Sequence, residues 1–344
     1  MSEKNLQVLL KSYPTGWVGA EHFDLVEAPM PAPADGEVLV RNVYLSADPY
    51  MRGRMSDSKD RYVAGFKIGE PISGYAVAEV VESRHSDFAA GDWVTSPALR
   101  WEHFSALSGD RSALRKVTPG PVPLSYYLGV LGMPGMTAYV GLLDIGEPKE
   151  GETVFVSAAS GAVGQIVGQI AKMKGCRVVG AAGSDQKIAY LLDDLGFDSA
   201  FNYKKVDKIS KALREHCPKG IDVYFENVGG ETLDAVLARM NTFGRIVACG
   251  MISQYNLERP EGIHNLINVV GQRLKMQGFI VSDHLDRAPQ FQSDVTGWLT
   301  AGKIKYREDL AQGLENAPAA LIGMLQGKNF GKQVIQIAAD ANRK

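Results

Sequence analysis

Cysteine is scarce in this chain, with only Cys176, Cys217 and Cys249 among its 344 residues. The three are far apart and odd in number, which excludes a disulfide framework and a C-x-x-C pair. Each is more typical of a small buried hydrophobic side chain than of a reactive group. The six histidines are scattered too, and none has the spacing of a metal-binding cluster.

The chain also lacks an excess charge of either sign and a long apolar run. Its formal net charge is −2 and no basic stretch stands out, so we expect no nucleic-acid partner. No segment is apolar enough to span a membrane, and the first residues lack the apolar core of a signal peptide. These absences predict a cytoplasmic protein. Its length suffices for two domains with substantial cores.

The first part of the chain is rich in β-forming residues. Two segments, 37–45 and 72–82, show partial alternation, and 92–97 and 104–107 are shorter candidates for strands. Prolines and glycines separate them. Short strands punctuated by turn residues predict a small barrel or sandwich.

From residue 151 onward, apolar strands and helices alternate. A helix is expected before this region at 135–143, and amphipathic segments after it at 291–300 and 314–325, followed by a last strand at 331–337. The alternating strands are expected at 153–157, 177–182, 199–202, 221–226, 244–249 and 275–279. Such alternation predicts a doubly wound parallel sheet. We expect the C-terminal piece to return to the β-rich domain.

A glycine-rich turn follows the first strand of the alternating region. The spacing Ala159-x-Gly161-x-x-Gly164 matches the dinucleotide fingerprint in two of its three positions. A turn of small residues used only for packing is an equally good interpretation of this segment alone. The second strand and helix complete a βαβ unit of about 30 residues, which favours the nucleotide.

The end of the second strand indicates which dinucleotide binds. NAD sites usually carry an acidic residue there, whereas this chain has Ala182, Gly183 and Ser184. Lys187 and Tyr203 follow nearby, and neutral or cationic groups suit a 2′-phosphate, so the pattern predicts NADPH. Asp185 is interpreted as a helix N-cap or first-turn acid, and Lys187 could equally be a solvated helix lysine.

Several motifs occur in an order that resembles a known family. They are DPYMRGRM (48–55), GMPGMTAY (132–139), AASGAVG (158–164), AAGSDQK (181–187), NYK (202–204), ENVGG (226–230), CGMISQYN (249–256) and GKNFGK (327–332). The set resembles the zinc-independent medium-chain dehydrogenase/reductases of the prostaglandin reductase and alkenal double-bond reductase group, and bacterial NADPH-dependent curcumin reductases most of all. The resemblance covers essentially the whole chain.

The resemblance implies an α/β fold with two domains. Residues 1–132 and 308–344 would form a β-rich GroES-like catalytic domain, and residues 133–307 an NADP-binding Rossmann domain. It also implies a homodimer that reduces the conjugated carbon–carbon double bond of enones and alkenals, including curcumin-type substrates, with NADPH. A quinone reductase on the same scaffold and a non-catalytic NADPH-binding protein remain as alternatives.

The same resemblance assigns cofactor contacts by position. The pyrophosphate would meet the glycine turn, the 2′-phosphate the end of the second strand, and the nicotinamide half the ends of later strands. The residues so assigned are Gly161, Ala162, Val163 and Gly164; Gly183, Ser184, Lys187 and Tyr203; Asn227; Cys249, Gly250, Ile252, Ser253, Tyr255, Phe279, Ile280, Val281 and Asn329; and Met133 and Thr137 beneath the nicotinamide.

No metal is expected in the chemistry. Zinc-dependent members of the superfamily need three protein ligands for a catalytic zinc and a four-cysteine lobe for a structural one. This chain has no histidine at Gly69-Glu70-Pro71 and no cysteine before Cys176. A hydrogen-bond donor must therefore stabilise the charge that develops on the substrate carbonyl oxygen.

Tyr255 is the first candidate for this donor, because it follows a strand end in a loop that binds cofactor in the family. A purely packing role for Tyr255 is the alternative. Tyr50 and Met51 follow an early strand and are expected to contact substrate, and Tyr62 is a further candidate for the pocket wall.

Overall fold

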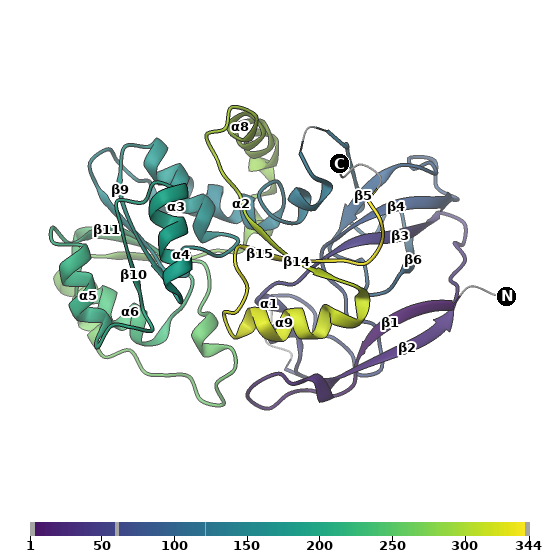
Figure 1. Cartoon of the computed structure of the whole chain (residues 1–344), viewed down its shortest axis with the longest axis horizontal. Helices are drawn as coiled ribbons and strands as arrows, with labels where there is room; N and C mark the ends of the chain where they lie inside the picture. Colours follow the sequence, from purple (N-terminus) through teal and green to yellow (C-terminus); the bar gives the residue numbers. More distant parts are fainter. Residues whose placement is uncertain (1–3, 59–61, 121, 341–344) are drawn as a thin grey trace. The chain divides into compact units, whose positions relative to one another are not determined.

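The computed structural model describes residues 4–58, 62–120 and 122–340, and the chain divides into two compact units (Figure 1). The terminal unit comprises Met1–Leu128, Glu308–Asn329 and Gln333–Lys344, and the central unit comprises Gly129–Arg307 and Phe330–Lys332. No helix among the described residues is long and apolar enough to cross a membrane.

The central unit is built on a six-stranded sheet of order β10-β9-β8-β11-β12-β13. Every pair of neighbouring strands in it is parallel. The chain steps outward from β8 and then returns to its other side, which gives two mononucleotide-binding halves. The strands are β8 (Thr153–Val156), β9 (Arg177–Ala182), β10 (Ser199–Asn202), β11 (Ile221–Glu226), β12 (Met240–Ala248) and β13 (Lys275–Gly278). The predicted doubly wound parallel sheet is confirmed.

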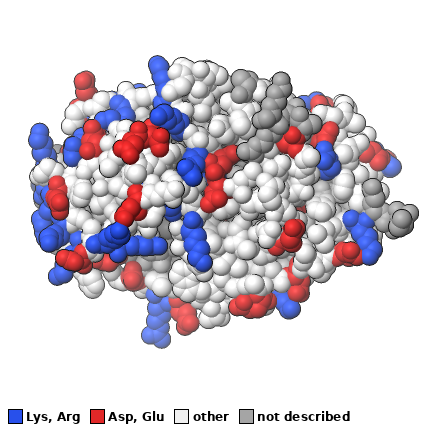
Figure 2. Space-filling model, in the orientation of Figure 1, with Lys and Arg blue, Asp and Glu red and all other residues white. Residues whose placement is uncertain are grey.

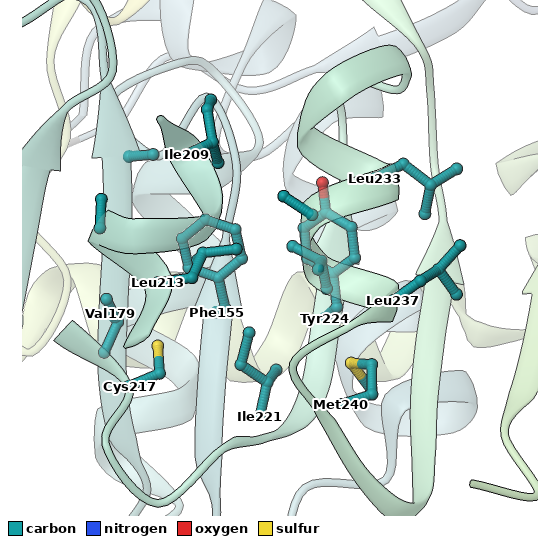
Figure 3. Close-up of a cluster of buried hydrophobic side chains, with 14 of the residues drawn as sticks. Phe155, Val179, Ile209, Leu213, Cys217, Ile221, Tyr224, Leu233, Leu237 and Met240 are labelled. Carbon is teal, nitrogen blue, oxygen red and sulfur yellow. The ribbon is translucent and has the colours of Figure 1, made fainter. Parts of the chain in front are cut away.

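Helices cover both faces of this sheet. On one face α5 (Ile209–His216) and α6 (Gly230–Leu237) enclose a buried apolar cluster, whose side chains point toward one another in Figure 3. Phe155 of β8 lies at its centre, stacked on Phe201 and Tyr224 with ring centroids 6.0 and 5.4 Å away. The other face is covered by α3 (Gly164–Met173) and by the π-helical turn Gly141–Gly146.

The remaining helices of the central unit are short or lie at the sheet edges. They are α2 (Met133–Val140), α4 (Asp185–Ala189), the π-helical turn Tyr190–Asp194, the 3-10 turns Ile252–Gln254, Asn265–Ile267 and Val281–Arg287, α7 (Asn268–Gly271) and α8 (Ala288–Thr300). The helix expected at 135–143 begins two residues earlier, because Pro134 fits the first turn of a helix, where its missing N–H costs no hydrogen bond.

The terminal unit is an antiparallel β structure with a β1–β2 hairpin and a larger sheet of order β14-β15-β3-β4-β5-β7, in which β6 also pairs with β3. Its strands are β1 (Lys4–Leu10), β2 (Phe23–Pro29), β3 (Glu37–Ser46), β4 (Ala76–Ser83), β5 (Trp93–Ser96), β6 (Phe104–Ser108), β7 (Arg115–Val117), β14 (Glu308–Gln312) and β15 (Lys332–Gln336). Its helices are α1 (Tyr50–Arg54), α9 (Ala317–Leu325) and the 3-10 turns Ala20–His22, Leu124–Leu128 and Leu314–Asn316. The expected β-rich domain is confirmed.

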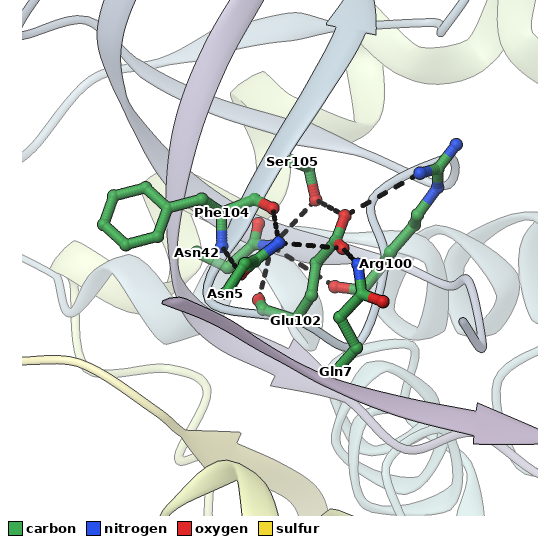
Figure 4. A network of polar contacts seen from close by, with 7 residues as sticks. All are labelled: Asn5, Gln7, Asn42, Arg100, Glu102, Phe104 and Ser105. Carbon is green, nitrogen blue, oxygen red and sulfur yellow. Dashed lines mark hydrogen bonds and ion pairs between the residues drawn. The ribbon is translucent and has the colours of Figure 1, made fainter. Parts of the chain in front are cut away.

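A buried polar network joins the β1–β2 hairpin to the larger sheet (Figure 4). The carboxylate of Glu102, only 1% exposed, accepts from Asn5 and Gln7 of β1 at 3.2 and 2.5 Å and from Ser105 of β6 at 2.8 Å. Asn42 of β3 donates to the main-chain oxygen of Glu102 at 2.8 Å. Burial raises the pKa of Glu102 in spite of these donors.

Glu102→Gln is expected to lower the free energy of unfolding by about 1–3 kcal/mol, and more at pH 4 than at pH 8. The raised pKa means that folded Glu102 binds its proton more tightly than the unfolded chain does. Its contribution to stability is therefore fully present below the ordinary pKa of about 4.5 and declines as the pH rises toward the folded pKa. Thermal unfolding at both pH values measures the difference, and an equal loss at both would contradict this prediction.

Charged side chains of both signs are interspersed over the face shown in Figure 2, with Lys and Arg gathered at the end that carries α5. Among the described residues, all three cysteines are free thiols. Cys176 and Cys217 are buried, as small hydrophobic side chains would be, and Cys249 is half-buried.

Candidate functional site

The glycine turn joins β8 tightly to α3. Gly161 N donates to Ala158 O at 2.9 Å, and Ala158 itself has a positive φ of 47°. A Cβ on Gly164 would lie 2.6 Å from Ala158 O and 2.7 Å from the Cα of Ala159. This close approach of helix to strand needs glycine, and it places the partly positive amino end of α3 directly after β8.

A second chain segment lies against this turn and was not predicted from the sequence. Gly331 forms a parallel bridge with Gly161, and Lys332 N donates to Arg307 O at 3.1 Å. The buried amide of Gln165 in α3 accepts from Arg307 N at 3.0 Å and donates to Arg307 O at 3.1 Å. Gly331 has a φ of 87°, and a Cβ there would lie 2.1 Å from Arg307 O. The motif 327–332 was the only sequence signal for this arrangement.

The ends of β9 and β10 bring together most of the residues predicted for a 2′-phosphate. Tyr203 N donates to Ala182 O at 3.1 Å, and a Cβ on Gly183 would lie 3.0 Å from the Tyr203 hydroxyl. Ser184 is the N-cap of α4, where its hydroxyl accepts from Lys187 N at 3.3 Å. The result is a compact polar corner, in which Asp185 is the adjacent acidic residue.

Asp185 occupies the first turn of α4, as one of its two sequence interpretations proposed. Asn202 Nδ2 donates to its carboxylate at 2.8 Å, and Lys205 forms an ion pair with it. These hydrogen bonds, that of Asn202 first, lower the pKa of Asp185. The carboxylate is thus engaged by its neighbours.

The ends of β11 and β12 carry the residues expected around the nicotinamide half. Asn227 Nδ2 donates to Ser157 O at 2.8 Å, and Ile252 N donates to Asn227 O at 3.1 Å. Cys249 and Gly250 begin the loop, and burial raises the pKa of the Cys249 thiol to about 12. The end of this loop contacts its beginning.

Tyr255 lies at the end of this loop, where its hydroxyl accepts from Met251 N at 3.1 Å. A Cβ on Gly250 would lie 3.0 Å from the same hydroxyl. The bond to Met251 uses the phenol as an acceptor. Both the packing and the donor interpretations of Tyr255 are compatible with this geometry.

The other predicted residues of the central unit lie on α2 and after β13. Thr137 Oγ1 donates to Met133 O at 2.8 Å within α2. Phe279 packs edge-on against His284, and a Cβ on Gly141 would lie 2.8 Å from its ring. Ile280 and Val281 begin the 3-10 turn that follows.

Four predicted residues belong to the terminal unit. Tyr50 and Met51 are the first residues of α1, and their side chains both face Gly74, with Met51 fully buried. Burial raises the pKa of Tyr50 well above its usual value, and Asp48 and Tyr62 add to the effect. Tyr62 is 66% exposed, and Asn329 directly precedes Phe330.

Neither unit offers a metal-binding cluster within the described part of the chain. No group of three or more His, Cys, Asp or Glu side chains there is placed to hold an ion.

Comparison with known proteins identifies the family. Residues 6–117 match the model of an N-terminal domain of oxidoreductase, and residues 162–296 match the model described as zinc-binding dehydrogenase. An NADP(+)-dependent 2-alkenal reductase of Nicotiana tabacum is 50% identical over 339 residues, which cover 98% of each chain. The chain belongs to the zinc-independent medium-chain dehydrogenase/reductases. This confirms the resemblance on which the cofactor assignments above depend.

Two further members of the medium-chain dehydrogenase/reductases are similarly close. The NADPH-dependent curcumin reductase of Escherichia coli K12 is 48% identical over 344 residues, again covering 98% of each chain. The crystal structure of CurA from Vibrio vulnificus in complex with NADPH has a TM-score of 0.92 at 48% identity, and the match covers 97% of this chain and 100% of that one.

Proposed function

We propose that this protein reduces the conjugated carbon–carbon double bond of ketones and aldehydes with NADPH. The observation that carries the proposal is the identity of 50% and 48%, over nearly the full length, to an NADP-dependent 2-alkenal reductase and an NADPH-dependent curcumin reductase. Both names describe substrates in which a double bond is conjugated to a carbonyl. The central unit would be the NADP-binding domain and the terminal unit the GroES-like catalytic domain.

The residues of the central unit fit the cofactor. The close packing at Gly164 brings the amino end of α3 within reach of a pyrophosphate. The corner formed by Gly183, Ser184 and Tyr203 suits a 2′-phosphate, with Lys187 as its cation. We assign the nicotinamide half to the loop that begins at Cys249, together with the segment after β13.

The chemistry needs a donor at the substrate carbonyl. When bound, NADPH supplies a hydride to the β-carbon of the substrate. Negative charge then develops on the carbonyl oxygen, and we assign its stabilisation to the Tyr255 hydroxyl, with the ribose 2′-hydroxyl as partner or rival. Tyr50, Met51 and Tyr62 would contact substrate, and the α-carbon would gain its proton from solvent or a tyrosine.

A screen of conjugated carbonyl compounds tests this function. NADPH consumption would be followed with 2-alkenals, enones such as curcumin, and quinones, and each product would be identified by mass spectrometry. We expect saturated aldehydes and ketones. Hydroquinone as the only product would indicate a quinone reductase instead, and NADPH oxidation that does not depend on any acceptor would indicate a non-catalytic binding protein.

Tyr255→Phe is expected to lower kcat about 100-fold with little change in the affinity for NADPH. The substitution removes the hydroxyl proton that would stabilise the developing oxyanion, and also the acceptor of the Met251 N–H. Steady-state kinetics with a deuterated cofactor would show whether hydride transfer limits the rate. Unchanged turnover under that condition would reduce Tyr255 to a packing residue.

We further propose that the protein is a homodimer formed through the edge of the central sheet. β13 is the last strand of that sheet, and apolar side chains are exposed on the segment that leads into it. Ile267 and Val270 are 73% and 74% exposed, and Leu274 N donates to Val269 O at 2.9 Å, which ties α7 to the start of β13. An exposed apolar surface beside an open strand edge favours association with a second copy.

Val270→Glu is expected to convert the dimer to a monomer, because it places a charge within the proposed apolar interface. Size-exclusion chromatography with light scattering measures the mass directly. Leu25→Glu on β2, at a residue that is 48% exposed, is the control and should leave the mass unchanged. A dimer that persists in Val270→Glu would rule out this face as the interface.

We also place the protein in the cytoplasm. The free state of Cys176, Cys217 and Cys249 supports a reducing compartment, as does the proposed use of NADPH.

A further inference from the structure

A buried carboxyl group at the end of β11 has no part in the chemistry proposed above. Glu226 is 0% exposed, and its Oε1 accepts from Tyr224 Oη at 2.7 Å, Val228 N at 2.5 Å and Gly229 N at 2.9 Å. Ser157 Oγ lies 3.2 Å from the same oxygen. Within the described part of the chain, Oε2 has no hydrogen-bond partner. Burying a carboxyl group is costly, so its retention here calls for a role.

The side chain of Glu226 holds the turn that follows it. Val228 N and Gly229 N both point at Oε1, which fixes two successive peptide groups. Gly229 has a φ of 76°, and a Cβ there would lie 2.8 Å from the Cβ of Met251. Asn227 is fixed separately, because its N–H donates to Ser157 Oγ at 2.9 Å. The turn 227–229 therefore has one orientation as long as the carboxyl group is in place.

The turn 227–229 also fixes the position of the loop 249–255. Ser253 donates to Val228 O from both its main-chain N at 3.0 Å and its hydroxyl at 2.6 Å. The main-chain oxygen of Glu226 accepts from Cys249 N at 3.0 Å and from Gly250 N at 3.1 Å. Both ends of the loop that carries Tyr255 are thus hydrogen-bonded to residues 226–228.

The sheet order places this assembly in one half of the nucleotide site. β8, β9 and β10 form the half that begins with the glycine turn, and β11, β12 and β13 form the other. In such sheets each half receives one mononucleotide at the carboxyl ends of its strands. Glu226 ends β11 and therefore belongs to the half opposite the 2′-phosphate corner.

We propose that Glu226 is a positioning residue for the nicotinamide mononucleotide half of the cofactor. It acts through the turn 227–229 and the loop 249–255, and it leaves the adenosine half unaffected. This inference rests on the proposed function, because it presumes that NADPH binds across the two halves of the sheet.

The test compares two nucleotides on the full-length protein by calorimetry. NADPH occupies both halves, whereas adenosine 2′,5′-bisphosphate occupies only the half with the 2′-phosphate corner. Glu226→Gln keeps the shape of the side chain but places an amide donor where Oε2 has no partner. We expect the Kd for NADPH to rise about tenfold and the Kd for the bisphosphate to stay within about twofold of the native value.

Two further variants make the result specific. Glu102→Gln removes an equally buried carboxyl group in the terminal unit, so it should lower stability yet leave both Kd values unchanged. Tyr224→Phe removes a donor to Glu226 Oε1 and should weaken NADPH about threefold, again without effect on the bisphosphate. It also serves if Glu226→Gln does not fold.

Each outcome bears on a stated claim. Native-like NADPH binding by Glu226→Gln, or an equal loss for both nucleotides, would overturn the role of Glu226 alone. If the native protein bound neither nucleotide, the proposed function would fail and this inference with it.

Discussion

Lys187→Ala is expected to raise the KM for NADPH about 10- to 100-fold and to leave the KM for NADH nearly unchanged. A lysine that contacts a doubly charged phosphate makes a charge-assisted hydrogen bond, which is worth about 1.5–3 kcal/mol. NADH has no 2′-phosphate, so this contact is absent for it. The variant should therefore lose most of its preference between the two cofactors.

The structure supports this assignment through the surroundings of Lys187. Ser184 caps α4 by accepting from Lys187 N, which sets the side chain one turn from the end of β9. The nearest acidic residue, Asp185, is engaged by Asn202 and Lys205. This carboxylate is therefore already paired, as the proposed phosphate site requires.

A control separates the specific contact from the loss of one positive charge. Lys219→Ala removes an exposed lysine of the same unit. This lysine lies next to the amino end of β11, whereas the proposed phosphate site lies at the carboxyl ends of the strands. It should change neither KM by more than about twofold, since exposed charges at a distance are largely screened. Equal losses for NADPH and NADH in Lys187→Ala would remove the 2′-phosphate assignment.

Gly164→Val is expected to lower the free energy of unfolding by about 3 kcal/mol or more and to abolish measurable NADPH binding. The added Cβ would lie 2.6 Å from Ala158 O, 2.7 Å from Ala159 Cα and 2.9 Å from Ala159 O. All three are main-chain atoms, which cannot move aside as the end of a flexible side chain can. Relief therefore requires α3 to shift away from β8, which opens the turn that is proposed to receive the pyrophosphate.

Two other glycines calibrate this prediction. Gly161→Ala brings its Cβ to 3.1 Å from a single atom, Ala158 O, so a smaller loss is expected. Gly297→Ala in α8 meets no atom within 4 Å and should be neutral or stabilising by up to about 1 kcal/mol. Urea unfolding and calorimetry with NADPH measure both effects. A Gly164→Val protein that unfolds and binds like the native one would contradict this account of the turn.

Three strands of the central unit, β9, β10 and β11, begin and end at the predicted residues. β9 and β11 are almost wholly buried and rich in apolar residues, as strands of a parallel sheet covered on both faces are. β10 lies at the sheet edge, and Phe201 is its one buried residue. β12 begins four residues before its predicted start, since Met240 pairs with Ile221 ahead of a register shift. Phe243 has a φ of 63° there, a local irregularity that no sequence pattern predicted.

The terminal unit was predicted less completely. Four strands, β1, β2, β7 and β14, were missed. β1 and β2 pair with each other across the short segment 11–22, but their attachment to the larger sheet depends on residues far apart in the chain. β1 is held to the larger sheet through Glu102, which lies 97 residues after Asn5. Such contacts form only when the chain has folded, and local sequence propensity does not predict them.

The sequence by itself determined the family, the alternation of strands and helices, and the small and neutral residues of the phosphate corner. These follow from periodicity and from residue size, which are local properties. Only the tertiary structure decided that Gly331 lies beside Gly161, that Gln165 holds Arg307, and that the carboxyl group of Glu226 supports two loops at once. The physical reason is that a buried polar group must find its partners in three dimensions, wherever the chain brings them.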